Sequence, residues 1–193
     1  MLDRRILVFV PVAILIFCAQ GCGQSGNTTL NLIGLGNGSE GEVTGGTEYC
    51  EAVADWNAQW AEFETAVLEL VNEHRAAGAD CGSGGSFAAA GPLSMNGELR
   101  CAARNHSMDM GTRDYFSHSS PEGEGPGERL NHAGYSPSTW GENIAWGYES
   151  PEAVVSGWMG SDGHCANIMN ANFTQIGVGY FEGSLWTQAF GRP

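Results

Sequence analysis

The longest amphipathic pattern in the chain covers residues 55–77. Apolar and aromatic residues recur there at intervals of three and four, which places them on one face of a helix. These positions are Trp56, Trp60, Phe63, Val67, Leu70, Val71 and His74. Gly78 follows the pattern and supplies a helix stop. We therefore expect a helix over 55–77 that buries this face, His74 included.

Further patterns predict shorter helices. Asn96 can cap a helix over residues 97–112. Its expected core face consists of Leu99, Ala102, Ala103, His106 and Met110. Ser150 and Pro151 suit the cap and first position of another helix, whose inner face would hold Val154, Val155 and Trp158. We also expect a helical turn over 128–133 and a short helix over 161–169.

The end of the chain has the pattern of a hairpin. Residues 175–181 and 185–190 are typical of two strands, and a turn at 182–184 separates them. The Gly-, Ala- and Ser-rich stretch 81–92 and the stretch 117–127 are expected to be loops. Helices followed by a hairpin indicate an α+β domain in which helices cover an antiparallel sheet.

The N-terminal residues 1–22 have the features of an export signal. Arg4 and Arg5 precede an uncharged apolar stretch, 6–17, that is too short to span a bilayer comfortably. The sequence Ala19-Gln20-Gly21-Cys22 resembles a bacterial lipobox, in which the cysteine is lipidated, although Gln20 departs from the usual small residue. The alternative is an ordinary secretory signal in which Cys22 is incidental.

This signal predicts an extracytoplasmic protein, lipid-anchored through Cys22 or secreted. Gly23 gives no inner-membrane retention signal, which favours the outer membrane for an anchored form. Residues 23–47 are rich in Gly, Asn, Ser and Thr and are expected to form a flexible linker. The remaining residues, 48–193, are enough for one domain with its own core.

The charge of the chain restricts its partners. The net charge is −14, and all eight basic residues are arginines. Nucleic-acid binding needs cations that neutralise phosphates, so this balance argues against it. It argues equally against docking on an anionic membrane through a basic patch.

Four cysteines fall within the expected domain: Cys50, Cys81, Cys101 and Cys165. An even number in an exported protein indicates two disulfides, and the scattered spacing does not resemble a zinc knuckle. Four cysteines allow three pairings, and the sequence alone does not choose among them.

Several motifs, in fixed order, resemble the bacterial branch of the CAP superfamily (SCP/PR-1-like domains). They are Val71-Asn72-Glu73-His74-Arg75, Asp114-Tyr115-Phe116-Ser117-His118-Ser119, Gly141-Glu142-Asn143-Ile144-Ala145, Trp158-Met159-Gly160-Ser161-Asp162-Gly163-His164, Cys165-Ala166-Asn167-Ile168-Met169, Asn172-Phe173-Thr174-Gln175-Ile176-Gly177-Val178-Gly179 and Trp186-Thr187-Gln188. The resemblance covers residues 66–191. It implies a three-layer α-β-α sandwich with a central cleft, and it favours the pairs Cys81–Cys165 and Cys50–Cys101.

The resemblance also implies a candidate metal site. In the eukaryotic branch two histidines and two glutamates line the cleft and can hold a divalent metal. His118 and Glu142 match two of them, whereas Ser161 and Asn172 stand where the other two would align. The bacterial branch places a histidine at His164 instead. Two imidazoles and one carboxylate suit zinc or another divalent metal and leave one position for water.

Other interpretations of these residues stay open. Glu142 could simply hold a Gly-Glu-Asn turn, with both histidines bonded to loop backbone. A serine nucleophile at Ser119, Ser120 or Ser161 could use a neighbouring histidine as its base, although no GxSxG motif is present. Three further histidines are expected to be structural: His74, His106 and His132. Four aromatic residues could line a ligand groove or fill a core: Trp140, Trp146, Tyr148 and Trp158.

Three functions are compatible with these features. The first is a membrane-tethered binding module for a small apolar ligand or a cell-envelope component. The second is a metal-dependent hydrolase of envelope or extracellular substrates. The third is a lipoprotein whose partner is another envelope protein. The missing half of the family's ligand set favours the first and third, and no catalytic residue is assigned.

Overall fold

The structure, a computed structural model, describes residues 47–193. The expected export signal, Cys22 and almost all of the expected linker lie outside the described residues. Within 47–193 no helix is long and apolar enough to cross a membrane.

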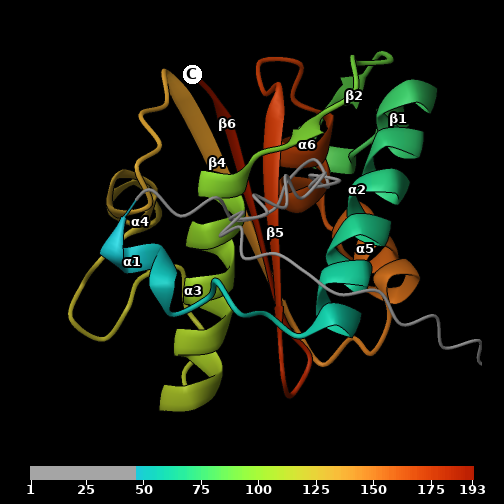
Figure 1. The fold of residues 1–193 in the computed structure, drawn as a ribbon. Helices are drawn as coiled ribbons and strands as arrows, with labels where there is room; N and C mark the ends of the chain where they lie inside the picture. The colour runs from blue at the N-terminus through green and yellow to red at the C-terminus, as the bar shows by residue number, and fades with distance from the viewer. Residues whose placement is uncertain (1–46) are drawn as a thin grey trace, which may run out of the picture. The chain divides into compact units, whose positions relative to one another are not determined.

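A four-stranded sheet forms the middle layer of residues 47–193 (Figure 1). Its strands are β3 (Ser94–Met95), β4 (Thr139–Trp146), β5 (Gln175–Phe181) and β6 (Leu185–Arg192). They lie in the order β3-β5-β6-β4, so β4 is an edge strand. β5 and β4 both pair antiparallel with β6, and the short β3 pairs parallel with β5. The predicted hairpin is confirmed, but the supposed Gly-Glu-Asn turn is wrong, because these residues belong to β4.

One face of the sheet is covered by α3 (Gly97–Arg113), with α1 (Glu48–Glu51) and α4 (Pro126–His132) beside it (Figure 1). The cap of α3 is confirmed, since the Asn96 side chain accepts a hydrogen bond from the backbone N–H of Leu99 at 2.8 Å. Glycines in β5 let α3 approach closely. A Cβ atom on Gly177 would lie 2.0 Å from the carbonyl carbon of Leu99.

The other face is covered by α2 (Ala58–Ala77), α5 (Pro151–Met159) and α6 (Asp162–Met169) (Figure 1). Ser150 caps α5 through a hydrogen bond from Ala153, as expected. The core between these helices and the sheet includes Val67, Val71, Val154, Val155, Trp158, Ile176, Val178, Trp186 and Phe190. The short elements β1 (Ala79–Asp80), η1 (Gly82–Gly84) and β2 (Ser86–Phe87) lie between α2 and β3. Helices on both faces of the sheet confirm the predicted three-layer α+β fold.

The buried face of α2 differs from the predicted one. The helix begins after Asn57, whose side chain accepts hydrogen bonds from Gln59 and Trp60. His74 is only half-buried, whereas Arg75 is 1% exposed. The guanidinium of Arg75 donates to four backbone carbonyls, those of Gly91, Ile168, Asn170 and Phe173, at 2.7–3.2 Å. These bonds offset the cost of burying the cation, which a hydrophobic pattern does not reveal.

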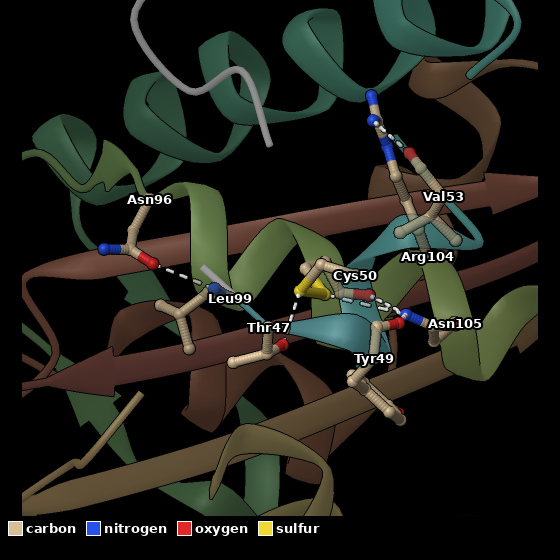
Figure 2. Close-up of a disulfide and its surroundings, with 9 residues drawn as sticks. Thr47, Tyr49, Cys50, Val53, Asn96, Leu99, Arg104 and Asn105 are labelled. Atoms are coloured by element: carbon tan, nitrogen blue, oxygen red, sulfur yellow. Dashed lines mark hydrogen bonds between the residues drawn. A yellow bond between two sulfur atoms is a disulfide. The ribbon is translucent and has the colours of Figure 1, made fainter. Parts of the chain in front are cut away.

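Two disulfides join distant parts of the described chain, in the pairs that the resemblance favours. Cys50–Cys101 holds α1 against α3, and Cys81–Cys165 holds the segment after β1 against α6. Figure 2 shows hydrogen bonds around the first disulfide. Asn105 donates to the carbonyl of Tyr49 at 3.0 Å, and Arg104 donates to the carbonyl of Val53 at 3.4 Å. The segment before α2 is therefore fixed to α3 by both covalent and polar contacts.

Candidate functional site

Glu142 is the centre of a polar cluster on β4. It lies opposite Ala189 of β6, whose side chain belongs to the core beneath α3, so Glu142 points to the face that α3 and α4 cover. Its side chain is 5% exposed. Oε1 lies 2.8 Å from Nδ1 of His118, and Oε2 accepts a hydrogen bond from Nη2 of Arg129 at 2.8 Å. Arg129, on α4, also donates to the carbonyl of His118.

The electrostatics of this cluster keep Glu142 charged. Burial alone raises the pKa of Glu142, but the hydrogen bond from His118 and the charge of Arg129 outweigh it, and the pKa lies below its ordinary value. His106, on α3, is 1% exposed, and its Nε2 lies 3.9 Å from Oε1 of Glu142. Burial lowers the pKa of His106 to about 4, despite the opposing effect of Glu142, so its imidazole is neutral at pH 7.

His164 is carried by a helix that packs on the other face of the sheet from α3 (Figure 1). It lies on α6, and its backbone carbonyl accepts a hydrogen bond from the side chain of Asn143 at 3.1 Å. Asn143 follows Glu142 in the strand and therefore points to the other face. Burial, followed by the charge of His118, lowers the pKa of His164. The structure thus brings His118 into contact with Glu142, while His164 lies close enough to His118 to respond to its charge but makes no hydrogen bond to Glu142 among those found in residues 47–193.

This arrangement does not fit the expected metal site. Both oxygens of Glu142 already have partners, and one of them is the guanidinium of Arg129, which would repel a metal cation. Within residues 47–193, no three His, Cys, Asp or Glu side chains are grouped so that they could hold a metal. The contacts instead show Glu142 joining β4 to α4 and to the loop that carries His118.

The serine alternative gains no geometric support either. The Ser120 side chain accepts a hydrogen bond from the backbone of Glu124 at 3.2 Å, and Ser161 lies directly before α6. Among the hydrogen bonds found in residues 47–193, none joins a serine hydroxyl to His118 or His164. A nucleophile needs such a bond to its general base.

The exposed aromatic residues lead to a second candidate site. Trp158 is part of the core and donates to the carbonyl of Ile144 at 3.2 Å, so it lines no groove. Trp146 and Phe116, in contrast, are 61% and 46% exposed. They border a groove of about 250 Å³ at the end of β4. The groove is lined by Met110, Gly111, Asp114, Tyr115, Phe116, Trp146, Glu182, Gly183 and Leu185.

The groove is built from three segments that are far apart in the sequence. The last turns of α3 supply Met110 and Gly111, and the following loop supplies residues 114–116. Trp146 ends β4, Glu182 and Gly183 belong to the turn of the β5–β6 hairpin, and Leu185 begins β6. Trp146 pairs in register with Leu185, so the sheet itself fixes the distance between two of the groove's walls.

Comparison with known proteins decides the family. The model of the cysteine-rich secretory protein family, CAP, matches residues 68–190. The chain belongs to this family. The match includes both candidate sites, because His118, Glu142 and Trp146 all lie within it. The solved structures include an extracellular CAP relative, an SCP-domain protein from Bacillus anthracis, with a TM-score of 0.59 and 29% identity over 69% of this chain and 41% of that chain.

Two curated CAP relatives come from Bacillus subtilis. The uncharacterized protein YkwD is 43% identical over 129 residues, which are 66% of this chain and 46% of the relative. The uncharacterized membrane protein YlbC is 38% identical over 88 residues, 46% of this chain and 25% of the relative. This chain therefore spans less than half the length of either. An outer surface protein from Borrelia burgdorferi shares the fold, with a TM-score of 0.54 and 18% identity over 68% of this chain and 90% of that protein.

Sequence reasoning missed two members of the Glu142 cluster. Arg129 lies outside the motifs that carry the CAP resemblance, and His106 was assigned a structural role without a partner. A buried carboxylate needs a paired charge, but any of the six arginines in residues 48–193 could supply it, so the sequence did not single out Arg129. His132, at the end of α4, lies beside this cluster, with its Nδ1 2.7 Å from Oε1 of Glu124 in the preceding loop.

Proposed function

We propose that this chain is a membrane-tethered, extracytoplasmic CAP-domain binding protein whose groove beside Trp146 takes a small apolar ligand of the cell envelope. The observation that carries the proposal is the groove itself. It is concave, bordered by two exposed aromatic rings, and based on the apolar side chains of Met110 and Leu185. Ligand sites are concave and largely apolar, with a few polar groups that orient the ligand.

The tether and the location rest on the N-terminal sequence. The export signal and Cys22 support a lipid anchor, and the linker would hold the domain away from the membrane. Two disulfides suit an oxidising compartment outside the cytoplasm. The names of the Bacillus anthracis and Borrelia burgdorferi relatives, an extracellular and an outer surface protein, agree with this location.

The contacts of Glu142 favour binding over metal-dependent hydrolysis. Arg129 occupies one carboxylate oxygen, and His118 occupies the other. Through these two bonds Glu142 links β4 to α4 and to the loop that carries His118. The same bonds help to position this loop, from which Tyr115 and Phe116 reach the groove.

A neutral fluorescent probe tests the binding function. N-phenyl-1-naphthylamine fluoresces more strongly in an apolar site, and we expect it to bind the purified chain. Trp146→Ala should weaken this binding about tenfold or more, because an aromatic wall contributes apolar area and ring contacts. Trp140→Ala is the matched control, since Trp140 is 46% exposed and lies outside the groove. No binding, or equal weakening by both variants, would contradict the proposal.

A further inference from the structure

We infer that, among small ligands with an apolar body, the groove beside Trp146 selects one that carries an ammonium group. This inference rests on the proposed binding function and names the ligand's charge. Three features of the groove support it: two exposed aromatic side chains, two carboxylates without an ion-pair partner in residues 47–193, and the C-terminal end of a helix.

Two aromatic rings lie side by side at the edge of the groove. The ring centroids of Phe116 and Trp146 lie 6.2 Å apart, with their planes tilted by 39°. The indole N–H of Trp146 donates to the carbonyl of Gly183 at 3.1 Å, which fixes the ring against the hairpin turn. The faces of aromatic rings are electronegative, and tryptophan attracts cations more strongly than tyrosine or phenylalanine. Because the hairpin holds the indole in place, little ordering cost falls on binding.

Negative charge borders the same groove. Asp114 and Glu182 line it and are exposed. Neither forms an ion pair with any residue in 47–193. Asp114 ends α3 in a left-handed conformation, with φ of 54°, and its backbone N–H donates to the carbonyl of Met110. The C-terminal end of a helix carries a partial negative charge, which adds to that of the two carboxylates.

The nearby cation Arg113 does not neutralise this charge. Its guanidinium bonds to Asp109 at 3.3 Å and to Glu122 at 2.5 Å, and it lies over the ring of Tyr115 at 5.8 Å. Arg113 is therefore directed to other partners than Asp114. The net charge of the chain, −14, further raises the local concentration of cations. The volume of about 250 Å³ suits one small molecule.

A pair of isosteric probes tests the preference for positive charge. Choline and 3,3-dimethylbutan-1-ol differ in having nitrogen or carbon at the quaternary centre, so they share one shape. We expect NMR titration of the purified chain to show at least about tenfold tighter binding of choline, and weaker binding at high salt. The double variant Asp114→Asn/Glu182→Gln should remove this preference. Asparagine accepts the left-handed conformation of Asp114, so the fold should persist.

A charge-matched control separates the groove from the net charge. Glu51→Gln/Glu73→Gln also removes two exposed carboxylates, on α1 and α2, and should leave the preference unchanged. Equal affinity for the two isosteres, or equal effects of the two double variants, would overturn the inference. If N-phenyl-1-naphthylamine still binds and depends on Trp146, the binding function survives that result. If the dye does not bind either, both proposals fail.

Discussion

Buried arginines organise the interior of this domain. Of the six arginines in residues 47–193, four are buried: Arg75, Arg100, Arg104 and Arg129. Arg100 and Arg104 both bond to Glu64, which is itself 0% exposed and also accepts a hydrogen bond from Trp56. A guanidinium can satisfy several acceptors in a fixed geometry, which suits such positions. The charges of Glu64, Arg100 and Arg104 are therefore paired with one another, as burial of charge requires.

The buried imidazole of His106 makes stability depend on pH. Because its pKa falls to about 4 in the folded chain, from an ordinary 6.5, the unfolded chain binds more protons between these values. Titration of His106 therefore leaves the free energy of unfolding unchanged above pH 6.5 and lowers it by about 3 kcal/mol as the pH falls to 4. Urea unfolding between pH 7 and 4 should show this loss in the wild type and a correspondingly smaller one in His106→Gln.

The NMR signals of the His106 ring provide an independent check. They should remain those of a neutral imidazole at pH 5, where an ordinary histidine is charged. Identical pH slopes for the wild type and His106→Gln, or a charged ring at pH 5, would contradict this interpretation.

Prediction from the sequence succeeded at single residues where a local rule applies. Asn96 and Ser150 cap the helices expected of them, because a cap depends on only three neighbouring residues. The contact between His118 and Glu142 required the family resemblance. Their contacts with Arg129 could not be predicted, because they join α4 to β4 across a loop whose path the sequence does not define.

At the scale of elements, β4 shows where periodicity fails. Its residues Glu142 and Asn143 are polar but point into opposite faces of the sandwich, so the strand lacks simple alternation. Asn143 is completely buried and bonds to Gln188 and Asn167, which lie on β6 and α6. These partners are distant in sequence.

The packing of α3 on β5 gives a prediction at the same scale. Gly177→Ala would place a Cβ atom 2.0 Å from the carbonyl carbon of Leu99 and 2.2 Å from the backbone nitrogen of Arg100. The helix and strand must then separate, so we expect urea unfolding to show a loss of about 3 kcal/mol or more, or no folded protein. Gly163→Ala, on α6, is the control.

A Cβ atom on Gly163 would meet no heavy atom within 4 Å, and alanine favours helix over glycine. Gly163→Ala should therefore leave stability unchanged or raise it by up to about 1 kcal/mol. Similar losses in the two variants would show that the close approach of α3 to β5 is not what requires a glycine.

At the scale of the whole molecule, the order of the motifs predicted the three layers correctly. The charged contacts between the layers could not be predicted from the sequence. Apolar periodicity reports which residues face a core, and it does so for Val67 and Val71 on α2. It assigns Glu64 and Arg75 of the same helix to solvent, although both are buried. The layers are thus specified by hydrophobic pattern, and their relative placement depends on paired charges and disulfides.

The two disulfides are expected to stabilise the molecule in different ways. They span 51 and 84 residues, so loop-closure entropy alone predicts about 4 kcal/mol for each. Cys81–Cys165 ties α6 to the segment after α2, and both belong to the main core, so Cys81→Ala/Cys165→Ala should lose about that amount in urea unfolding. Cys50–Cys101 holds only α1 and the segment before α2 on α3.

Removal of Cys50–Cys101 should therefore release this N-terminal segment before the sandwich unfolds. In Cys50→Ala/Cys101→Ala, limited proteolysis should cut between α1 and α2, near the exposed Ala54 and Asp55, while the urea midpoint falls less than in the other variant. Arg104 and Asn105 still bond to this segment, which is why the release is local and partial. Resistance to the protease, with equal losses of stability in both variants, would instead make α1 an inseparable part of the folded unit.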